Sequence, residues 1–389
     1  MKRLSTKATS IKPSGIRKFF DLANTMEGVI SLGVGEPDFA TPWHICENAI
    51  HYMSTGHTHY TANRGLLELR EEICKFHKEH YNQVYDPESE VIVTIGGSEA
   101  IDLCMRALLN PGDEVIVLDP NYVAYAPSVI LSDGVVVPLQ LKEENDFKII
   151  PEDLKKVITP KTKAMIINYP SNPTGGVMTK EDYAKIVDII KESGIYVVSD
   201  EIYAELCYGD EEYESIAHIE GMYDRTIVVN GFSKSFSMTG WRLGYAMGPK
   251  PLIETMTKIH QSCIMCSPTT SQYAGITALT SCDEEILKMK EEYDFRRKYC
   301  VRKLNEMGLH TFEPRGAFYV FPNITSSGMD SDTFCMELLK RKNVAIGPGT
   351  AFGESGEGFA RISYAYSLSH LQTALGRIED FLHEIKEEK

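Results

Sequence analysis

The fold of this chain is decided by residues 226–247, which read TIVVNGFSKSFSMTGWRLGYAM. The apolar run at 226–229 predicts a buried strand, and it leads into a turn of small and hydroxylated residues that carries Ser233 and Lys234. Eight residues after this lysine, Arg242 opens a second apolar run at 243–247. We therefore expect an amine, several hydroxyls and a guanidinium to meet where a sheet ends. Such groups suit a phosphorylated aldehyde, because the amine can form a Schiff base while the others bind phosphate.

Composition indicates an ordinary globular protein of two domains. The chain has 389 residues, of which 43% are hydrophobic and 24% charged. Its 40 basic and 55 acidic side chains give a formal net charge of −15, which argues against nucleic acid or an anionic membrane as a partner. No apolar run approaches the ~18 residues of a membrane span, and the first residues lack an apolar signal core. We expect a cytoplasmic protein that begins with an N-terminal arm, although the basic, hydroxyl-rich start leaves a transit peptide conceivable.

The nine cysteines are odd in number and scattered along the chain, which favours reduced thiols over a disulfide framework. Cys263 and Cys266 form a lone Cys-x-x-Cys motif. A zinc site of this type needs a second pair, so we predict no metal there.

The lysine turn, read together with Gly240-Trp241-Arg242-Leu243-Gly244, resembles the pyridoxal-phosphate-dependent aminotransferases of fold type I, class I/II. The resemblance extends from about residue 31 to 371 and is strongest to aromatic and broad-specificity branches. It implies an α/β fold, with a mostly parallel seven-stranded sheet between helices in a large domain and a smaller α+β domain beside it. We place the large, cofactor-binding domain at 45–290 and the small domain at 1–44 and 291–389.

Periodicity and turn residues predict the individual elements. We expect strands at 29–32, 91–95, 114–120, 134–141 (an edge strand), 164–168, 195–200, 316–321, 344–346 and 359–364. We expect helices at 66–78, 99–109, 183–193, 284–307, 331–341 and from 369 onward. From 251 the chain should also be helical, with an apolar loop at 263–268 inside the stretch 259–279.

An anion site is predicted where the strand at 91–95 turns into a helix. The glycine-rich turn leaves main-chain N–H groups free at the positive end of the helix dipole. Strand, glycine turn and helix recur in many α/β proteins, so the pattern is not specific by itself. The nearby Ser233 and Arg242 would seek the same anion, and we expect these two with Gly97, Ser98 and Glu99 to bind the cofactor phosphate.

Several polar side chains follow predicted strands, where open α/β sheets bind their ligands. Asp200 can pair with the pyridine nitrogen of the cofactor and keep it protonated. The resemblance implies that Asn172 and Tyr203 donate to the phenolic oxygen of the cofactor and that Tyr122 lies on its ring. A helix cap for Asp200 and a core position for Tyr122 are the structural alternatives.

The resemblance also assigns substrate and subunit contacts. Arg361 stands in an otherwise apolar and hydroxyl strand and would clamp the substrate α-carboxylate, with Asn172 and the turn at Gly35 beside it. Tyr60 would reach the cofactor phosphate of the neighbouring subunit, so a homodimer with shared active sites is expected.

Together these residues predict an aminotransferase in which Lys234 holds the cofactor and moves the Cα proton, transferring the amino group from an L-amino acid to a 2-oxo acid such as 2-oxoglutarate. Ser98 and the apolar loop at 263–266 favour aromatic or large apolar donors, unless His260, Lys12 or Arg17 enters the pocket. The alternatives are a carbon–sulfur β-lyase of the same fold and an aspartate or N-acetyl-diaminopimelate aminotransferase. A regulator that merely holds the cofactor would carry a DNA-binding domain as well, and we expect the residues before Val29 to be too few for one. A nicotinamide dehydrogenase would need the glycine-rich dinucleotide-binding motif, which this sequence does not show.

Overall fold

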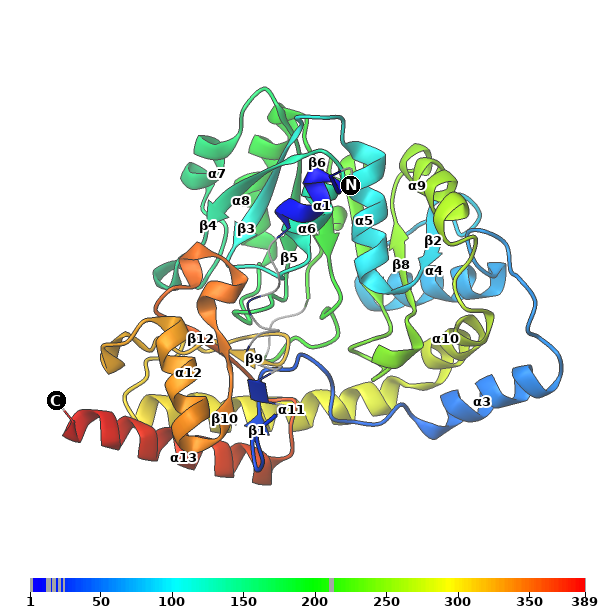
Figure 1. Cartoon of the computed structure of the whole chain (residues 1–389). Coiled ribbons are helices and arrows are strands. Elements are labelled where there is room, and N and C mark those ends of the chain that lie inside the picture. Colours follow the sequence, from blue (N-terminus) through cyan, green and yellow to red (C-terminus); the bar gives the residue numbers. More distant parts are fainter. Residues whose placement is uncertain are drawn as a thin grey trace.

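A seven-stranded sheet forms the centre of the molecule, which is known from a computed structural model (Figure 1). The structure describes residues 3–11, 15, 19, 22–23, 25–209 and 213–388. The strand order is β2-β8-β7-β6-β5-β3-β4, and β8 runs in the direction opposite to the other six strands of this sheet. The strands are β2 (Val91–Thr94), β3 (Glu114–Asp119), β4 (Val135–Gln140), β5 (Thr162–Asn168), β6 (Tyr196–Asp200), β7 (Thr226–Gly231) and β8 (Gly244–Met247). The predicted fold class is confirmed.

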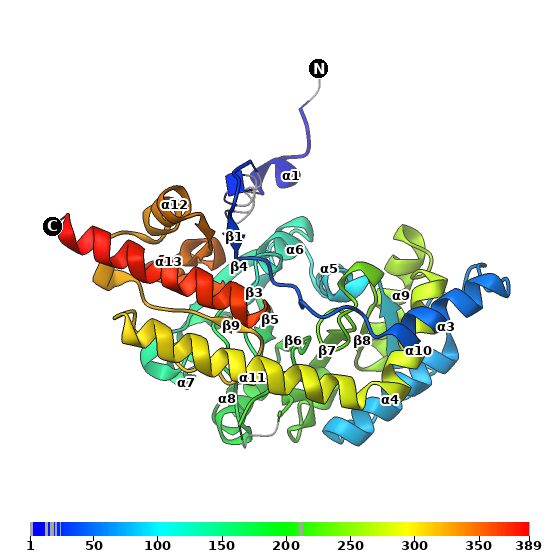
Figure 2. The same cartoon turned by 90° about the horizontal axis from the view of Figure 1, so that it is seen from below.

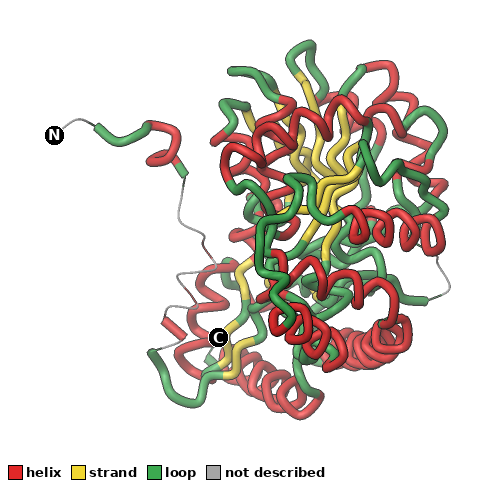
Figure 3. The backbone as a smooth tube through the Cα atoms, turned by 90° about the vertical axis from the view of Figure 1, so that its right-hand side faces the viewer, coloured by secondary structure: helices red, strands yellow, loops and turns green. Residues whose placement is uncertain are grey.

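Both faces of this sheet are covered by helices, as Figure 3 shows. Alternate residues of a strand point to opposite faces, so Ile116 packs with helices α7 and α8 while Val117 packs with α5, α6 and α9. Helices α3, α4 and α10 cover the β2–β8 end of the sheet. These helices are α3 (Trp43–Ser54), α4 (Leu67–Tyr81), α5 (Gly96–Leu108), α6 (Tyr125–Leu131), α7 (Pro151–Val157), α8 (Lys180–Ser193), α9 (Lys250–Cys263) and α10 (Thr269–Ser281).

The C-terminal part has its own hydrophobic cluster and two small sheets. Strand β1 (Ile30–Ser31) pairs with β10 (Val344–Ala345), and β12 (Ala360–Ser363) pairs with both β11 (Gly347–Pro348) and β9 (Tyr319–Val320). Helices α12 (Ser331–Lys342) and α13 (Leu368–Glu387) pack over them. The long helix α11 (Asp283–Glu306) contributes Ile286 to the core of the large sheet and Tyr293 to this second core, and Figure 2 shows it running beneath both parts.

Register places three strand ends side by side at one edge of the sheet. Asn168 of β5 pairs with Asp200 of β6, and Asp200 pairs in turn with Val229 of β7. Parallel pairing therefore brings the ends of these three strands, and the turn that follows β7, to one place.

The first helix, α1 (Thr6–Ser10), projects from the rest of the chain (Figure 3). Its Lys7 Nζ lies 2.7 Å from Asp133 Oδ2. Within the described ranges, no helix is both long and apolar enough to cross a membrane.

Most predicted elements are confirmed, including the edge strand at 134–141. Helix α8 begins with a capping box formed by Thr179 and Asp182. The predicted helix at 99–109 begins earlier, at Gly96, so the glycine turn is itself the first turn of α5. The predicted strand at 316–321 is reduced to Tyr319–Val320. Sequence reasoning missed α3, α6 and α7 and did not foresee that β8 is antiparallel.

Candidate active site

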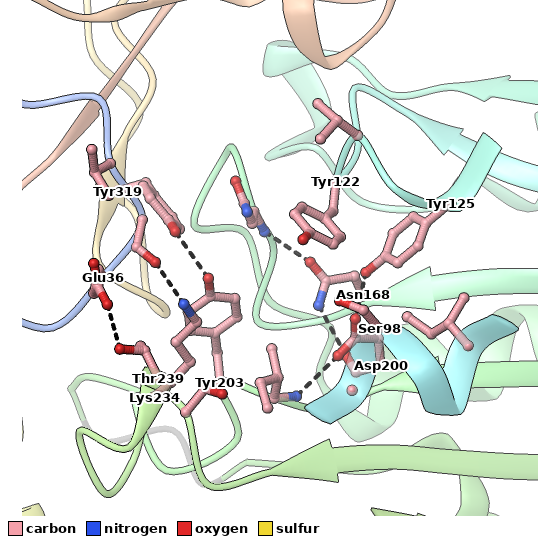
Figure 4. Close-up of a pocket in the computed structure, with 18 of the residues that line it drawn as sticks. Glu36, Ser98, Tyr122, Tyr125, Asn168, Asp200, Tyr203, Lys234, Thr239 and Tyr319 are labelled. Atoms are coloured by element: carbon pink, nitrogen blue, oxygen red, sulfur yellow. Dashed lines mark hydrogen bonds between the residues drawn. The ribbon is translucent and has the colours of Figure 1, made fainter. Parts of the chain in front are cut away.

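A cavity of about 350 Å³ opens where β5, β6 and β7 end, between the central sheet and the C-terminal part. It is shown in Figure 4. Eleven of the predicted site residues line it, contributed by seven separate segments: Gly35, Gly97, Ser98, Tyr122, Asn172, Asp200, Tyr203, Ser233, Lys234, Arg242 and Arg361. The structure therefore brings together residues that lie more than 300 positions apart in the sequence.

Lys234 lies three residues beyond the end of β7. Its Nζ donates to the carbonyl oxygen of Gly35 at 2.5 Å. Removal from water lowers the pKa of the amine to about 8, the carboxylate of Glu36 opposes this shift, and the guanidiniums of Arg361 and Arg242 add to it. A lysine in this environment loses its proton, and so becomes nucleophilic, at a pH much closer to 7 than an exposed lysine does.

Asp200 ends β6, and its carboxylate is buried. Oδ2 accepts a hydrogen bond from the hydroxyl of Tyr125 at 2.7 Å, and Oδ1 accepts one from the backbone N–H of Ile202 at 3.2 Å. Burial raises the pKa of Asp200 to about 6 despite these donors. A cationic partner in the cavity would relieve this cost, which is the role expected for a protonated ring nitrogen.

Arg361 projects from β12 into the cavity and is buried. It donates to Asn172 Oδ1 at 2.8 Å and to the carbonyl oxygen of Gly33 at 2.5 Å. The guanidinium lies between the rings of Tyr319 and Phe352, at 4.5 and 4.4 Å from their centroids. Its Nε is buried without a hydrogen-bond partner, and no described carboxylate forms an ion pair with it. A buried guanidinium held by neutral groups has charge left for an anion.

Tyr203 and Tyr319 meet beside this guanidinium, with their hydroxyl oxygens 2.9 Å apart. Gly35 comes so close to them that a Cβ added there would lie 2.1 Å from the Tyr319 hydroxyl oxygen. The absence of a side chain at Gly35 is therefore required by the packing.

The opposite end of the cavity is built for an anion. Gly97 and Ser98 are in the first turn of α5, where backbone N–H groups have no helical partner. Arg242 lies over the same turn, because a Cβ on Gly96 would be 2.9 Å from its Nη2. Ser233 lines the same cavity.

Glu99 and Tyr60 differ from the other predicted residues, because neither lines the cavity. The Glu99 carboxylate accepts from the backbone N–H of Ile95 at 2.5 Å and lies 2.8 Å from Nδ1 of the buried His260. His260 is thereby kept out of the cavity. Tyr60 is 80% exposed on the surface of the chain. Lys12 and Arg17 lie outside the described residues.

Sequence reasoning missed three aromatic residues of the site, Tyr125, Tyr319 and Phe352. Tyr125, the first residue of α6, follows Tyr122 by three positions. Residues at this spacing on a helical turn lie on the same side, so the position of Tyr122 could have pointed to Tyr125. Nothing in the sequence marks Tyr319 or Phe352, because their partner Arg361 is reached only through the tertiary fold.

The donor set fits pyridoxal phosphate. Arg242 and the first turn of α5 match its phosphate, Asp200 matches its ring nitrogen, and Lys234 matches its aldehyde. The fold and the site together define a pyridoxal-phosphate-dependent enzyme of fold type I.

Comparison with known proteins gives the family. The family described as aminotransferase class I and II matches residues 27–378. A putative aminotransferase of Bacillus subtilis, YugH, is 50% identical over 98% of both chains, and the aspartate aminotransferase of Pyrococcus abyssi is 46% identical over 98% of this chain and 99% of its own. The crystal structure of an aromatic aminotransferase from Pyrococcus horikoshii superposes with a TM-score of 0.91 at 45% identity, covering 95% of this chain and 99% of that one. The chain belongs to the class I and II aminotransferases, enzymes that depend on pyridoxal phosphate.

Proposed function

We propose that this aminotransferase takes its amino group from an aromatic or large apolar L-amino acid and passes it to a 2-oxo acid such as 2-oxoglutarate. The observation that carries the proposal is the number of cations in the cavity. Among the described residues that line it, the basic side chains are Lys234, Arg242 and Arg361. Lys234 is assigned to the aldehyde of the cofactor, Arg242 to its phosphate and Arg361 to the α-carboxylate of the substrate. No cation therefore remains to pair with a second carboxylate on the substrate.

The remaining lining supports the same donor class. Val34, Ile101, Val123, Ile202 and Phe352 give the cavity apolar walls beside its polar groups. An apolar side chain gains from leaving water for such walls, whereas an unpaired carboxylate would lose its hydration without a partner.

We assign the polar groups as follows. Pyridoxal phosphate, when bound, supplies a ring that accepts electrons from the substrate Cα. Arg361, held by Asn172 and the Gly33 carbonyl, orients the α-carboxylate. Lys234 takes the proton from Cα and returns it to the cofactor side, a role that suits an amine with a pKa of about 8. Asp200 keeps the ring nitrogen protonated.

Asn172 and Tyr203 are assigned to the phenolic oxygen of the cofactor, and Tyr122 to the face of its ring. Gly97, Ser98 and Ser233 with Arg242 are assigned to its phosphate. We also assign Glu99 to this end, through its backbone N–H in the first turn of α5 and through the contact that holds His260.

A homodimer is proposed because Tyr60 does not line the cavity of its own chain. It is 80% exposed, and Trp43, Ile50 and Met265 are further exposed apolar side chains. The projecting helix α1 is a second segment suited to contact a partner. Tyr60 would then reach the phosphate bound by the neighbouring subunit.

Two further proposals concern the organisation and location of the chain. The large, cofactor-binding domain is assigned to 45–290, and the small domain to 1–44 and 291–389. A cytoplasmic location is also proposed, and the buried free thiols of Cys104 and Cys300 support it.

The names of the relatives include both aspartate and aromatic aminotransferases, so donor choice needs measurement. We would compare single-turnover rates of the first half-reaction for phenylalanine, tyrosine, aspartate and N-acetyl-diaminopimelate, following the cofactor spectrum. The proposal expects the two aromatic donors to be fastest. A clear preference for aspartate or N-acetyl-diaminopimelate would overturn it. Pyruvate released without any acceptor acid would indicate the β-lyase instead.

A further inference from the structure

A second cavity, of about 300 Å³, lies behind the turn that follows Lys234. Residues 235–237 of that turn form one wall. The opposite walls come from the start of α3 and the start of α11, with Trp43, His44, Cys282 and Glu285 among the lining residues. No step of amino-group transfer uses this cavity.

Three side chains with metal-binding atoms converge in it. The Sγ atom of Cys282 lies 3.2 Å from Nε2 of His44, and Nδ1 of His44 lies 3.9 Å from a carboxylate oxygen of Glu285. One ligand atom from each residue lies within 4.8 Å of the other two. The residues come from separate segments, since His44 is in the first turn of α3 and Cys282 directly precedes α11.

We propose that His44, Cys282 and Glu285 form a binding site for a zinc ion. Thiolate sulfur, imidazole nitrogen and carboxylate oxygen are the protein ligands of zinc. Bonds of about 2.0–2.3 Å at tetrahedral angles place such atoms about 3.4–3.7 Å apart. One ring nitrogen of His44 binds the ion, so the relevant separations are those within 4.8 Å, and rotation of the His44 and Glu285 side chains would have to shorten the longest of them by about 1 Å. The cavity leaves room for a water molecule as the fourth ligand.

Access to the site and its charge suit a cation. Cys282 is 1% exposed, whereas the side chains of His44 and Glu285 are 36% and 41% exposed, so an ion can enter from solvent and reach the thiol. Asp283 adds negative charge in the first turn of α11. The opposing cation that lines the cavity, Lys288, lies 3.5 Å from Glu284 and is largely neutralised by it.

Binding releases one proton. Zinc binds sulfur as a thiolate, so the thiol of Cys282 gives up its proton when the ion binds. The ion forms a bond to sulfur as the S–H bond breaks, and the proton leaves to solvent without any change of oxidation state.

Cobalt(II) replaces zinc as a coloured probe in the test. The full-length enzyme loaded with pyridoxal phosphate, treated with a chelator and kept free of amino acids, is titrated with Co²⁺ while the thiolate-to-cobalt charge-transfer band is followed. We expect one Co²⁺ per chain, displaced by Zn²⁺. Cys282→Ser should abolish the band. His44→Gln and Glu285→Gln should each weaken binding at least about tenfold.

The matched control is Cys263→Ser, which removes an exposed thiol elsewhere and should leave the titration unchanged. If Cys282→Ser does not fold, the two variants at the partly exposed positions decide the matter. A titration without the charge-transfer band, or a band that persists in Cys282→Ser or is unaffected by both His44→Gln and Glu285→Gln, overturns the proposal. In addition, zinc should raise the midpoint of thermal unfolding of the parent enzyme by more than that of His44→Gln at the same zinc concentration.

Discussion

The hydroxyl of Tyr125 donates a hydrogen bond of 2.7 Å to Oδ2 of Asp200, and both side chains are buried. The bond joins the start of α6 to the end of β6. It stabilises the ionised form of the carboxylate that is assigned to the ring nitrogen of the cofactor. A residue that is assigned to neither the substrate nor the cofactor can in this way influence the charge of the cofactor.

Replacing Tyr125 by phenylalanine should therefore weaken catalysis without removing any group that contacts the substrate. Loss of a hydrogen bond to a buried charged group costs about 1.5–3 kcal/mol, which corresponds to a fall of roughly ten- to a hundredfold in kcat/KM. The pKa of Asp200 should rise further above 6, and cofactor affinity should fall. Steady-state kinetics and cofactor titration measure these effects.

The matched control for this variant is Tyr183→Phe, which alters another buried tyrosine, on α8 within the core of the large sheet. Its kcat/KM should stay within about twofold of the parent. Equal losses of activity in both variants would show that the effect of Tyr125→Phe is one of general packing.

The pH dependence of cofactor capture should report the depressed pKa of Lys234. Only the neutral amine attacks an aldehyde, so the rate at which apoenzyme captures pyridoxal phosphate should rise with pH and level off above about 8. Stopped-flow absorbance measures this rate. A rate that keeps rising beyond pH ~10, where an ordinary lysine loses its proton, would contradict the prediction. Lys234→Ala should capture no cofactor covalently and lose at least about 10³-fold in turnover.

Alanine at position 35 should disturb the substrate end of the site. The new methyl group would lie 2.1 Å from the hydroxyl oxygen of Tyr319, so this ring must move away from Tyr203 and from the guanidinium of Arg361. Overpacking of this kind costs about 1–3 kcal/mol, and we expect KM for the amino acid to rise several-fold. Gly376→Ala provides the comparison, because no atom lies within 4 Å of a Cβ there, and it should keep the parent kinetics.

Lysine at position 98 should shift donor preference toward dicarboxylates. Ser98 lines the cavity near the phosphate end. A lysine at this position would add a cation that can pair with the distal carboxylate of a dicarboxylic substrate. We expect the ratio of kcat/KM for aspartate to that for phenylalanine to rise about tenfold or more, equivalent to ~1.4 kcal/mol. Ser98→Thr keeps a hydroxyl and should leave the ratio unchanged. An unaltered ratio in Ser98→Lys would mean that the distal carboxylate is received elsewhere.

The buried carboxyl of Glu201 should make stability depend on pH. Its burial raises the pKa to about 7, from 4.5 for the free side chain. Between these values the folded chain keeps a proton that the unfolded chain has released, so the stabilising contribution is complete below about pH 4.5 and is lost as the pH rises to about 7. The shift corresponds to a change on the order of 3 kcal/mol in the free energy of unfolding.

Glu201→Gln isolates this contribution, because glutamine keeps an oxygen acceptor for Ser199 and Ser215 while both proteins retain Asp200 and His77. Measured by denaturant unfolding at one protein concentration, the stability of the parent relative to the variant should fall from about pH 5 to about pH 8. A constant difference would show that the carboxyl does not titrate in this range.

The sequence predicted the strand ends well, because apolar runs that stop at Asp200 or before Lys234 leave little choice of where the charged side chain lies. The helices it missed have weaker local signals: α6 has only seven residues and α3 lacks a side-chain cap. The neighbours of the Arg361 side chain could not be predicted from the sequence for another reason. Tyr319 and Phe352 come to this side chain through the pairing of β12 with β9 and β11. Gly33 comes to it because the preceding Leu32 accepts a hydrogen bond from Ser363 at the end of β12. Such pairing is decided by the whole fold.

The pairing of Asn168 with Asp200, and of Asp200 with Val229, limits where the length of this chain can change. Removing a single residue from β6 would turn every later side chain of the strand to the opposite face and point Asp200 toward a layer of helices. Insertions and deletions are therefore compatible with catalysis only beyond these ends, in the connecting loops. Designers who wish to enlarge or reshape the pocket should alter loop lengths and leave the three strands at their present number of residues.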